Sequence, residues 1–365
     1  MLDRTKHSTT TAGSVMALMG QMDGWGGLEP RAEAPAPMRA GTPAEVAELR
    51  AAIEAIAAQL ADEVRHAGRD AELTKAIVHT LHQHSLKAGP TLSLSVLARD
   101  LEELAHEAMF KLDTFRRLVK DGDFAAAFQP IVDLETGEAH HYEALVRFGP
   151  GEYALKPHEF ITFAENVGLI HEFDLAMCRK ILEFLICVDD PGYVVAVNLS
   201  AGSLESPAFL AALLELLHRH EVVRHRLGFE VTETAKIADL ASVNAFLQGL
   251  RREGHIVCLD DFGAGSAAFQ YLRTLQVDAV KIDGAYIKNA RATSEGGRFL
   301  KAMTWLIHEL DIDTIAEMVE DQDHLDAIRG CNILYGQGYL FGKPSTDIAS
   351  FSPYRMLGPY RTLAS

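Results

Sequence analysis

The sequence lacks any cysteine pair with the spacing of a zinc or redox site. Its four cysteines are widely scattered, and none forms a CxxC motif. It also lacks an apolar run approaching the ~20 residues that cross a bilayer. The N-terminal run SVMALMG is too short for the apolar region of a secretory signal. These absences predict a cytoplasmic protein with reduced thiols and no membrane association.

Basic residues are also few. The 34 Lys and Arg residues face 51 Asp and Glu residues, and the formal net charge is -17. This balance argues against a broad surface for DNA, for an RNA polymer or for an anionic membrane, although a local basic site for a small phosphate ligand remains compatible with it. A chain of 365 residues with 48% hydrophobic residues suits one large α/β domain and a smaller unit.

The N-terminal third divides by composition. Residues 1–44 are rich in Thr, Gly, Ala and Pro, and we expect a flexible tail there. Residues 45–112 show helical periodicity, with a narrow apolar seam from Val46 to Val64 and further helices predicted over about 69–87 and 94–120. The seam either packs within this region or pairs with a second chain. We therefore expect a dimerisation or regulatory region, which also offers helices to a partner protein.

From Asp123 onward, eight short β-rich runs alternate with amphipathic helical stretches. The runs are AFQPIVDL, HHYEALVRF, VVAVNLS, LGFEVTE, IVCLDDF, AVKID, DTIAEMV and ILYGQGYL. Several are apolar at consecutive positions, as in strands that are covered on both faces. Eight parallel β/α units predict an α/β protein with a closed, TIM-like (β/α)8 barrel, preceded by the α-helical N-terminal region.

Polar residues recur at the ends of these runs, where the strands of a β/α barrel open on one mouth. They are Asn198, Glu230, Asp260, Asp261, Lys281, Glu317 and Gln337. With Glu143 they offer hard oxygen ligands, which suit Mg²⁺ or Mn²⁺. More than three carboxylates indicate two cations with one bridging carboxylate, an arrangement typical of phosphoryl displacement. Any single acid could instead cap a helix or form a surface ion pair, but the shared strand-end position favours a site.

The motifs also carry a resemblance. FQPIVDL, EAL with VRF, FITFAENVGLI, VNLSAGSL, FEVTETA, LDDFGAG, VKIDGAYI, AEMVE and QGYLFGKP follow one another in this order. The stretch resembles the EAL domain, the cyclic-di-GMP phosphodiesterase family of bacteria. The resemblance implies a barrel domain over residues 113–347 that hydrolyses cyclic di-GMP to linear pGpG with two Mg²⁺ or Mn²⁺ ions. Residues 348–365 would then form a C-terminal tail.

The resemblance also implies individual roles. The metal ligands would be Glu143, Asn198, Glu230, Asp260, Asp261 and Glu317. Lys281 would contact the catalytic water, Gln129 and Arg147 would contact the substrate, and Gln337 would support the site. Glu233 matches the glutamate that steadies the loop after the paired aspartates. Because EAL domains commonly pair near that loop, a homodimer is expected.

Three departures from the family pattern bear on activity, and one of them is a longer segment, GCNILYGQGYL, before Gln337. The loop after the paired aspartates has Ser266, Ala267 and Ala268 where the family usually has a tyrosine and two serines. Met318 replaces a small residue beside Glu317, a change expected to tighten or tilt that ligand. These changes leave an alternative open, a receptor or scaffold that binds cyclic di-GMP without hydrolysing it. The complete set of ligands with Lys281 favours the enzyme, and without a GGDEF signature a cyclase activity is unsupported.

Overall fold

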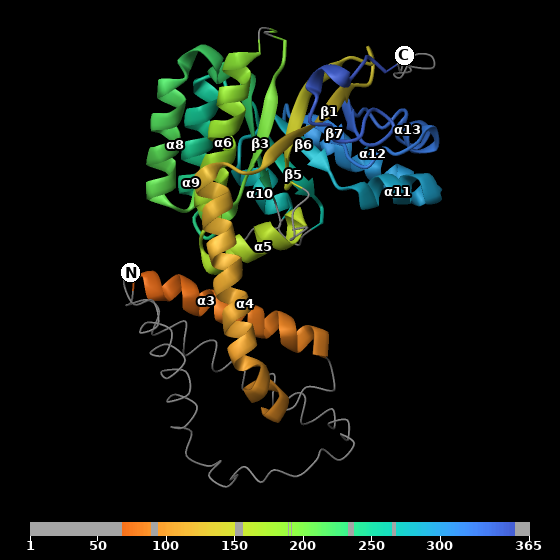
Figure 1. The fold of residues 1–365 in the computed structure, drawn as a ribbon. Coiled ribbons are helices and arrows are strands. Elements are labelled where there is room, and N and C mark those ends of the chain that lie inside the picture. Colours follow the sequence, from red (N-terminus) through yellow and green to blue (C-terminus); the bar gives the residue numbers. More distant parts are fainter. Residues whose placement is uncertain are drawn as a thin grey trace. The chain divides into compact units, whose positions relative to one another are not determined.

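The computed structural model describes most of the second half of the chain and part of the first (Figure 1). The described residues are 68–88, 94–149, 156–188, 190, 192–232, 237–264 and 268–354. The expected tail at 1–44, the seam from Val46 to Val64, and Glu233 lie outside them. By internal contacts the chain divides into two compact units, Met1–Asp113 and Thr114–Ser365.

The described part of the N-terminal unit is helical. It contains α3 (Gly68–Ala88) and most of α4 (Leu94–Asp121), which lie where the sequence predicts helices. Within α4, Leu104, Ala108 and Leu112 are buried at intervals of four residues. This spacing places their side chains on one face of the helix, as expected for an amphipathic helix.

Eight strands form a closed barrel in the C-terminal unit, in the order of the sequence. They are β1 (Ala125–Asp133), β2 (Ala139–Arg147), β3 (Val195–Leu199), β4 (Leu227–Thr232), β5 (Val257–Phe262), β6 (Ala279–Ile282), β7 (Asp313–Ala316) and β8 (Tyr335–Gln337). All four residues of β6 are buried, because helices cover one face of the strand and side chains fill the other. The expectation of a TIM-like barrel is confirmed.

The expectation of eight parallel units is wrong for the first strand. Strand β1 runs antiparallel to both of its neighbours, β2 and β8, whereas all other neighbouring strands are parallel. The connection from β1 to β2 is a tight turn, in which the Asp133 carboxylate accepts hydrogen bonds from the backbone N–H groups of Glu135 and Thr136. A turn of this length joins antiparallel strands only. The hairpin places Gln129 directly opposite Glu143.

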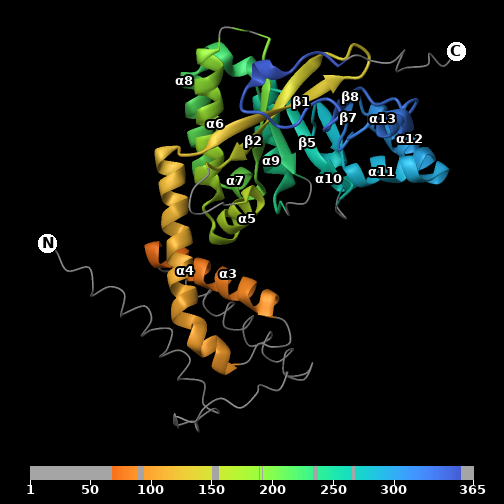
Figure 2. The ribbon, with the colours of Figure 1, turned by 45° about the vertical axis from the view of Figure 1, so that its right-hand side comes forward.

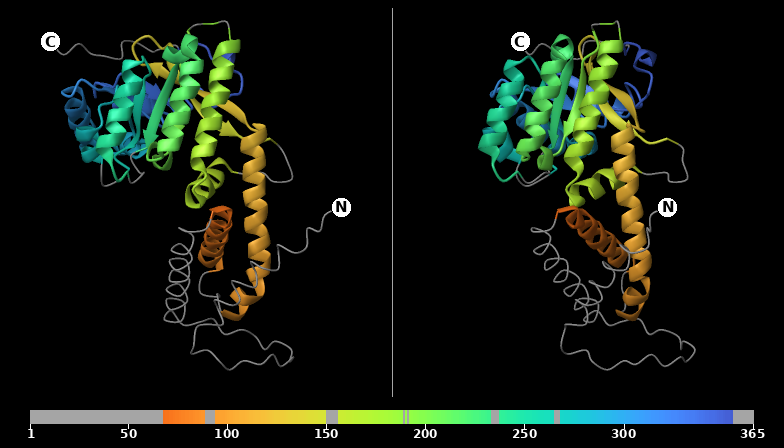
Figure 3. Two further views of the ribbon diagram at one scale, coloured as in Figure 1. Left: turned by 90° about the vertical axis from the view of Figure 1, so that its left-hand side faces the viewer. Right: turned by 60° about the vertical axis from the view of Figure 1, so that its left-hand side comes forward.

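Helices surround the barrel (Figures 1 and 2). They are α5 (Pro157–Val167), α6 (Ile170–Cys187), α7 (Ala201–Leu204), α8 (Pro207–Arg219), α9 (Leu240–Arg252), α10 (Ala268–Thr274), α11 (Gly284–Ala292), α12 (Ser294–His308) and α13 (Gln322–Ile328), with 3₁₀ helices η2 (Glu221–Arg226) and η3 (Ile348–Ser350). Helices α6 and α8 lie side by side outside the strands (green in Figures 1 and 3), while α11, α12 and α13 pack together elsewhere (blue).

Side-chain oxygens cap several of these helices and fix where they begin. Asp239, Asp283, Thr293 and Asp321 each accept a hydrogen bond from a backbone N–H of the following first turn. Within the described residues, no helix has both the length and the hydropathy that a membrane span requires.

The barrel interior has an apolar floor beneath a polar layer. A core cluster comprises Ile131, Cys258, Ala279 and Ile315. Each of these four residues lies two positions along its strand from a polar residue that points into the barrel. The two residues of each pair therefore lie on the same face of the strand. In β1 the order is reversed, with Gln129 before Ile131, because that strand is antiparallel. His141, two residues before Glu143, is buried as well, and burial lowers its pKa to about 3. The floor is thus uncharged, and ionisable groups gather at the carboxyl ends of the strands.

Candidate active site

The ammonium group of Lys281 lies among four carboxylates at the mouth of the barrel. Its Nζ atom is 2.8 Å from Glu230, 2.9 Å from Asp260, 3.2 Å from Glu143 and 3.2 Å from Glu317. The lysine side chain is only 1% exposed. The carboxylates come from β2, β4, β5 and the residue that follows β7, so the barrel brings together acids that are far apart in sequence.

Three amide side chains complete this layer around Glu143. Asn198 Nδ2 donates to Glu143 Oε1 at 2.8 Å, and Gln337 Nε2 donates to Oε2 at 2.6 Å. Gln337 Nε2 also lies 3.3 Å from Gln129 Oε1, and Gln129 Nε2 donates to the carbonyl of Gly342. Both oxygens of Glu143 are therefore fixed in direction by groups from β3 and β8.

The acids form two overlapping groups that suit a metal ion. Glu143, Glu230 and Asp260 make one group, and Asp260, Asp261 and Glu317 make the other, with ligand atoms within 4.8 Å of one another in each. Asp260 belongs to both groups. Among the described residues, no donor lies within hydrogen-bond distance of the buried Glu230 Oε1 atom. An all-oxygen donor set with an unsatisfied buried carboxylate oxygen fits hard divalent cations such as Mg²⁺, Mn²⁺ or Ca²⁺.

The net charge of the acidic cluster also indicates a site for cations. Five carboxylates and one ammonium leave four negative charges in a space closed from below by the apolar floor. Burial raises the pKa of Glu230 well above its usual value and that of Glu317 to about 8, and burial with the Asp260 charge raises the pKa of Asp261 to about 6. Protons and cations therefore compete for the same oxygens.

Glu143 and Lys281 are held in their charged forms by this surrounding. Burial would raise the pKa of Glu143, but the Lys281 charge and the hydrogen bonds from Gln337 and Asn198 bring it below its usual value. Burial would lower the pKa of Lys281, but Asp260 and the other acids raise it well above its usual value. In the metal-free site the lysine is consequently held in its charged form.

Two site residues have an unusual backbone. Asp261 and Met318 adopt the left-handed region, with φ values of 55° and 53°. The Met318 side chain is 47% exposed and lies against Gly284, where a Cβ atom would come within 2.3 Å of its Sδ atom. The methionine thus points at α11 and leaves Glu317 grouped with Asp260 and Asp261. The substitution beside Glu317 does not displace this carboxylate.

One expected site residue, Arg147, stands apart from this cluster, and another, Glu233, has no described position. Arg147 shares the inward face of β2 with Glu143, but it lies four residues, or roughly 13 Å, further toward the mouth. Its guanidinium donates to the Val146 carbonyl at 2.8 Å. Glu233 falls outside the described residues, so the structure gives it no place.

The sequence analysis missed Asp174 of α6. Its Oδ2 atom accepts hydrogen bonds from Ser200 N at 2.9 Å, Ser200 Oγ at 2.8 Å and Ser203 Oγ at 2.6 Å. Ser200 follows Asn198 by two residues, so Asp174 anchors the turn that carries this amide. A signal was available, because Asp174 falls in register with the buried stripe of Phe173 and Met177 on an amphipathic helix.

Asp174 should make stability depend on pH. Burial raises its pKa to about 6, above the value of the unfolded chain, so its contribution is full at low pH and is lost as the pH rises through 6. Asp174→Asn should therefore remove about 1 kcal/mol of the fall in unfolding free energy between pH 5 and pH 7. Urea unfolding of both metal-free proteins across this range measures the difference. Equal pH slopes would show that Asp174 does not titrate there.

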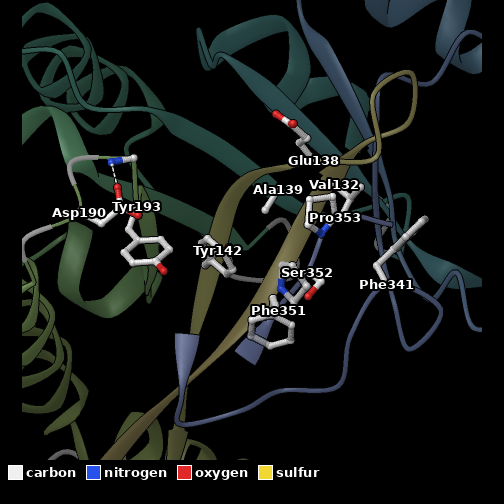
Figure 4. A pocket seen from close by; sticks show the side chains of 12 residues that line it. Val132, Glu138, Ala139, Tyr142, Asp190, Tyr193, Phe341, Phe351, Ser352 and Pro353 are labelled. Atoms are coloured by element: carbon white, nitrogen blue, oxygen red, sulfur yellow. Dashed lines mark hydrogen bonds between the residues drawn. The ribbon is translucent and has the colours of Figure 1, made fainter. Parts of the chain in front are cut away.

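A separate pocket of about 230 Å³ lies on the outer face of β1 and β2 (Figure 4). The rings of Tyr142, Tyr193 and Phe351 line it, with centroids 5.7 to 5.8 Å apart along the Tyr142 contacts. Phe351 belongs to the part of the expected C-terminal tail that the structure describes. Tyr142 faces outward while its neighbour Glu143 faces the interior, so the pocket contains none of the clustered acids.

The fold and the site define a class, an eight-stranded barrel with a buried, all-oxygen site for divalent cations at the strand ends. Residues 112–344 match the EAL domain family. The chain belongs to this family, and the resemblance seen in its motifs is confirmed.

Individual relatives agree with this assignment. The cyclic di-GMP phosphodiesterase PdeB of Shewanella oneidensis is 31% identical over 237 residues, 64% of this chain and 28% of that protein. The cyclic di-GMP phosphodiesterase NbdA of Pseudomonas aeruginosa is 30% identical over 277 residues, 75% of this chain and 35% of that protein. This chain thus spans about a third of the length of these relatives. The solved PaMucR phosphodiesterase in complex with c-di-GMP has a TM-score of 0.57 and 27% identity, covering 64% of this chain and 97% of that one.

Proposed function

We propose that this protein hydrolyses cyclic di-GMP to linear pGpG with two divalent cations, Mg²⁺ or Mn²⁺, in the bacterial cytoplasm. The observation that carries the proposal is the pair of oxygen groups that share Asp260, with Lys281 among them. The names of PdeB, NbdA and PaMucR support the choice of ligand and reaction. Two dications would balance the four negative charges of the cluster.

The residues that would hold the cations are Glu143, Asn198, Glu230, Asp260, Asp261 and Glu317. Bound there, a pair of cations supplies Lewis-acid chemistry, which acidifies a water and stabilises the oxygens that enter and leave the phosphorus. The buried apolar floor keeps bulk water from reaching this layer from below. The protein's own part is to hold the acids in place, which the amides of Gln337 and Asn198 do for Glu143.

Lys281 would act on the reacting groups through its fixed charge. Its raised pKa keeps it protonated, so it would orient the attacking water by donating a hydrogen bond and would offset charge that develops on the phosphate. Arg147, nearer the mouth, would bind a phosphate or ribose oxygen of the dinucleotide. Gln129 would contact the substrate beside Glu143, and Glu233 would steady the loop after Asp261.

The alternative, a receptor that binds cyclic di-GMP without hydrolysis, has less support. A receptor needs the pocket but needs neither two complete oxygen groups nor a lysine buried among them. The departure at Met318 leaves Glu317 within its group. Signal transfer through the N-terminal helices to another protein is compatible with both proposals.

Metal dependence tests the reaction. Purified protein incubated with cyclic di-GMP should form pGpG with Mg²⁺ or Mn²⁺ roughly a hundredfold faster than with Ca²⁺, because calcium's looser coordination misplaces water and phosphate. Chromatography of the nucleotides measures the product, and a chelator gives the blank. Tight binding of cyclic di-GMP without pGpG in any ion would establish the receptor instead.

We also propose a homodimer. The expected seam lies outside the described residues, but the barrel offers a surface on α12, where Phe299, Trp305 and Leu306 are exposed together with Leu310 just after the helix. Trp305 is 63% exposed. Burying such a ring against a second copy is favourable, since aromatic residues often dominate interfaces.

Trp305→Glu should weaken dimerisation by roughly tenfold or more, because it places a charge in an apolar contact. Light scattering across a dilution series measures the change. Leu214→Glu on α8, where the leucine is 48% exposed, is the matched control and should leave the dimer intact. If Trp305→Glu dimerises like the parent protein, α12 is not the interface.

A further inference from the structure

The turn after the paired aspartates is held in an uncommon backbone conformation. Asp261 has φ 55° and Gly263 has φ 96°, and Ala264 N donates to Asp261 O at 3.0 Å to close the turn. This region costs free energy for residues other than glycine, least for Asn and Asp, and contacts around the turn help to hold it. The direction of the Asp261 carboxylate therefore depends on whatever presses on the turn.

Tyr286 of α11 contacts this turn directly. Its hydroxyl donates to the Gly263 carbonyl at 3.2 Å, and its ring covers the glycine so closely that a Cβ atom there would come within 2.4 Å of the ring. A backbone bond from Asp283 N to Phe262 O, at 3.3 Å, joins the start of α11 to the same turn. The Asp283 side chain in turn caps α11 and fixes where the helix begins.

The ring of Tyr286 is itself held from a second side. Phe299 of α12 stacks on it with centroids 5.8 Å apart and an interplanar angle of 11°. The contact runs from α12 through Tyr286 to Gly263 and ends two residues from Asp261. The loop has Ser266, Ala267 and Ala268 where its family usually has a tyrosine and two serines, and α11 offers a ring and a hydroxyl at this turn.

We infer that Tyr286 is a positioning residue that fixes the Asp261 carboxylate for its cation. The inference rests on the proposed two-cation site and assigns it a support that comes from outside the loop. Both contacts of Tyr286, the hydroxyl on the carbonyl and the ring on the Cα, fall on Gly263, two residues after Asp261. A ring that served core packing alone would affect the free energy of unfolding without affecting how the cations bind.

Mn²⁺ binding without substrate is the direct test, measured by calorimetry on the whole 365-residue chain. Tyr286→Leu should weaken the more weakly bound Mn²⁺ by tenfold to a hundredfold, as expected for loss of a group that orients a ligand. Tyr286→Phe, which keeps the ring and folds as the parent does, should weaken it by roughly fivefold through loss of one hydrogen bond. In turnover, kcat should fall with Mn²⁺ affinity while KM for cyclic di-GMP stays within about threefold.

Tyr193→Leu is the matched control, because this tyrosine precedes β3 at the opposite end of the barrel from the mouth. It should lower the melting temperature without changing Mn²⁺ affinity. If both Tyr286 variants bind Mn²⁺ as the parent does, the inference is wrong, whatever their stability. Because binding is measured without substrate, the result stands even if the protein proves not to hydrolyse cyclic di-GMP.

Discussion

Asp260→Asn should lower the rate of cyclic-di-GMP hydrolysis by about a thousandfold or more. Asp260 is the one acid shared by both oxygen groups, so its loss weakens two cation sites at once. Cations of this kind contribute several kcal/mol to the transition state, and each 1.36 kcal/mol is a factor of ten in rate. Calorimetry should show fewer than two Mn²⁺ ions bound. Glu143→Ala removes a carboxylate from one group only, so it should retain one ion while also losing turnover.

Asp311→Asn supplies the control for this experiment. Asp311 is an exposed aspartate with a left-handed backbone, φ 56°, in the turn before β7 at the opposite end of the barrel. The same chemical change there should leave rate and Mn²⁺ binding unchanged. Near-normal turnover by a folded Asp260→Asn protein would remove Asp260 from the ligand set.

Lys281→Met should change the free energy of unfolding and the rate of hydrolysis, but not the affinity for cyclic di-GMP. In the metal-free protein it removes the ammonium that contacts four buried carboxylates, and breaking such a buried network costs about 3 to 5 kcal/mol of unfolding free energy. Mn²⁺ should restore most of this loss by replacing the missing positive charge. The rate should fall roughly a hundredfold or more, because a fixed charge near the reacting groups is worth that much. Affinity for cyclic di-GMP should change less than about threefold.

Denaturation with and without Mn²⁺, single-turnover kinetics and equilibrium binding give the three quantities. Lys120→Met, at an exposed position in the last turn of α4, should alter none of them. If the affinity of Lys281→Met falls as far as its rate, the lysine binds substrate and does not serve the chemical step. If the metal-free variant is as stable as the parent, the acids are neutralised by protons and not by Lys281.

The barrel and its acids could be predicted because their signals are local. Each strand appears as an apolar run, and Asn198, Glu230, Asp260 and Lys281 fall where the runs end. Knowing that strand ends meet at one mouth was then enough to bring these residues together. The direction of β1 had a local signal too, since the turn after Asp133 is short and rich in turn formers. The prediction of eight parallel units followed instead from the regular alternation of strands and helices in the later units.

Other features have no local signal. The stacking of Tyr286 on the turn at Gly263 joins segments whose contact depends on how α11 packs, and nothing in VKIDGAYI indicates it. The direction of Met318 depends on a backbone torsion, so the sequence alone could not decide whether it would tilt Glu317. Asp174 lies between these cases, because an acid on an apolar helix stripe signals a buried partner without identifying Ser200.

The closure of the barrel between its first and last strands also sets the order in which the site can be assembled. Strand β8 closes the barrel by pairing with β1, and Gln337 then reaches Glu143 across 194 residues of chain. A ribosome adds 5 to 20 residues per second, so roughly 10 to 40 s separate the synthesis of these two partners. During that interval Glu143 lies on a hairpin whose β1 edge is unpaired. The later strands must then fold without occupying the place of β8. The final ligand geometry is therefore an event of late synthesis, completed only when the end of the barrel domain has left the exit tunnel.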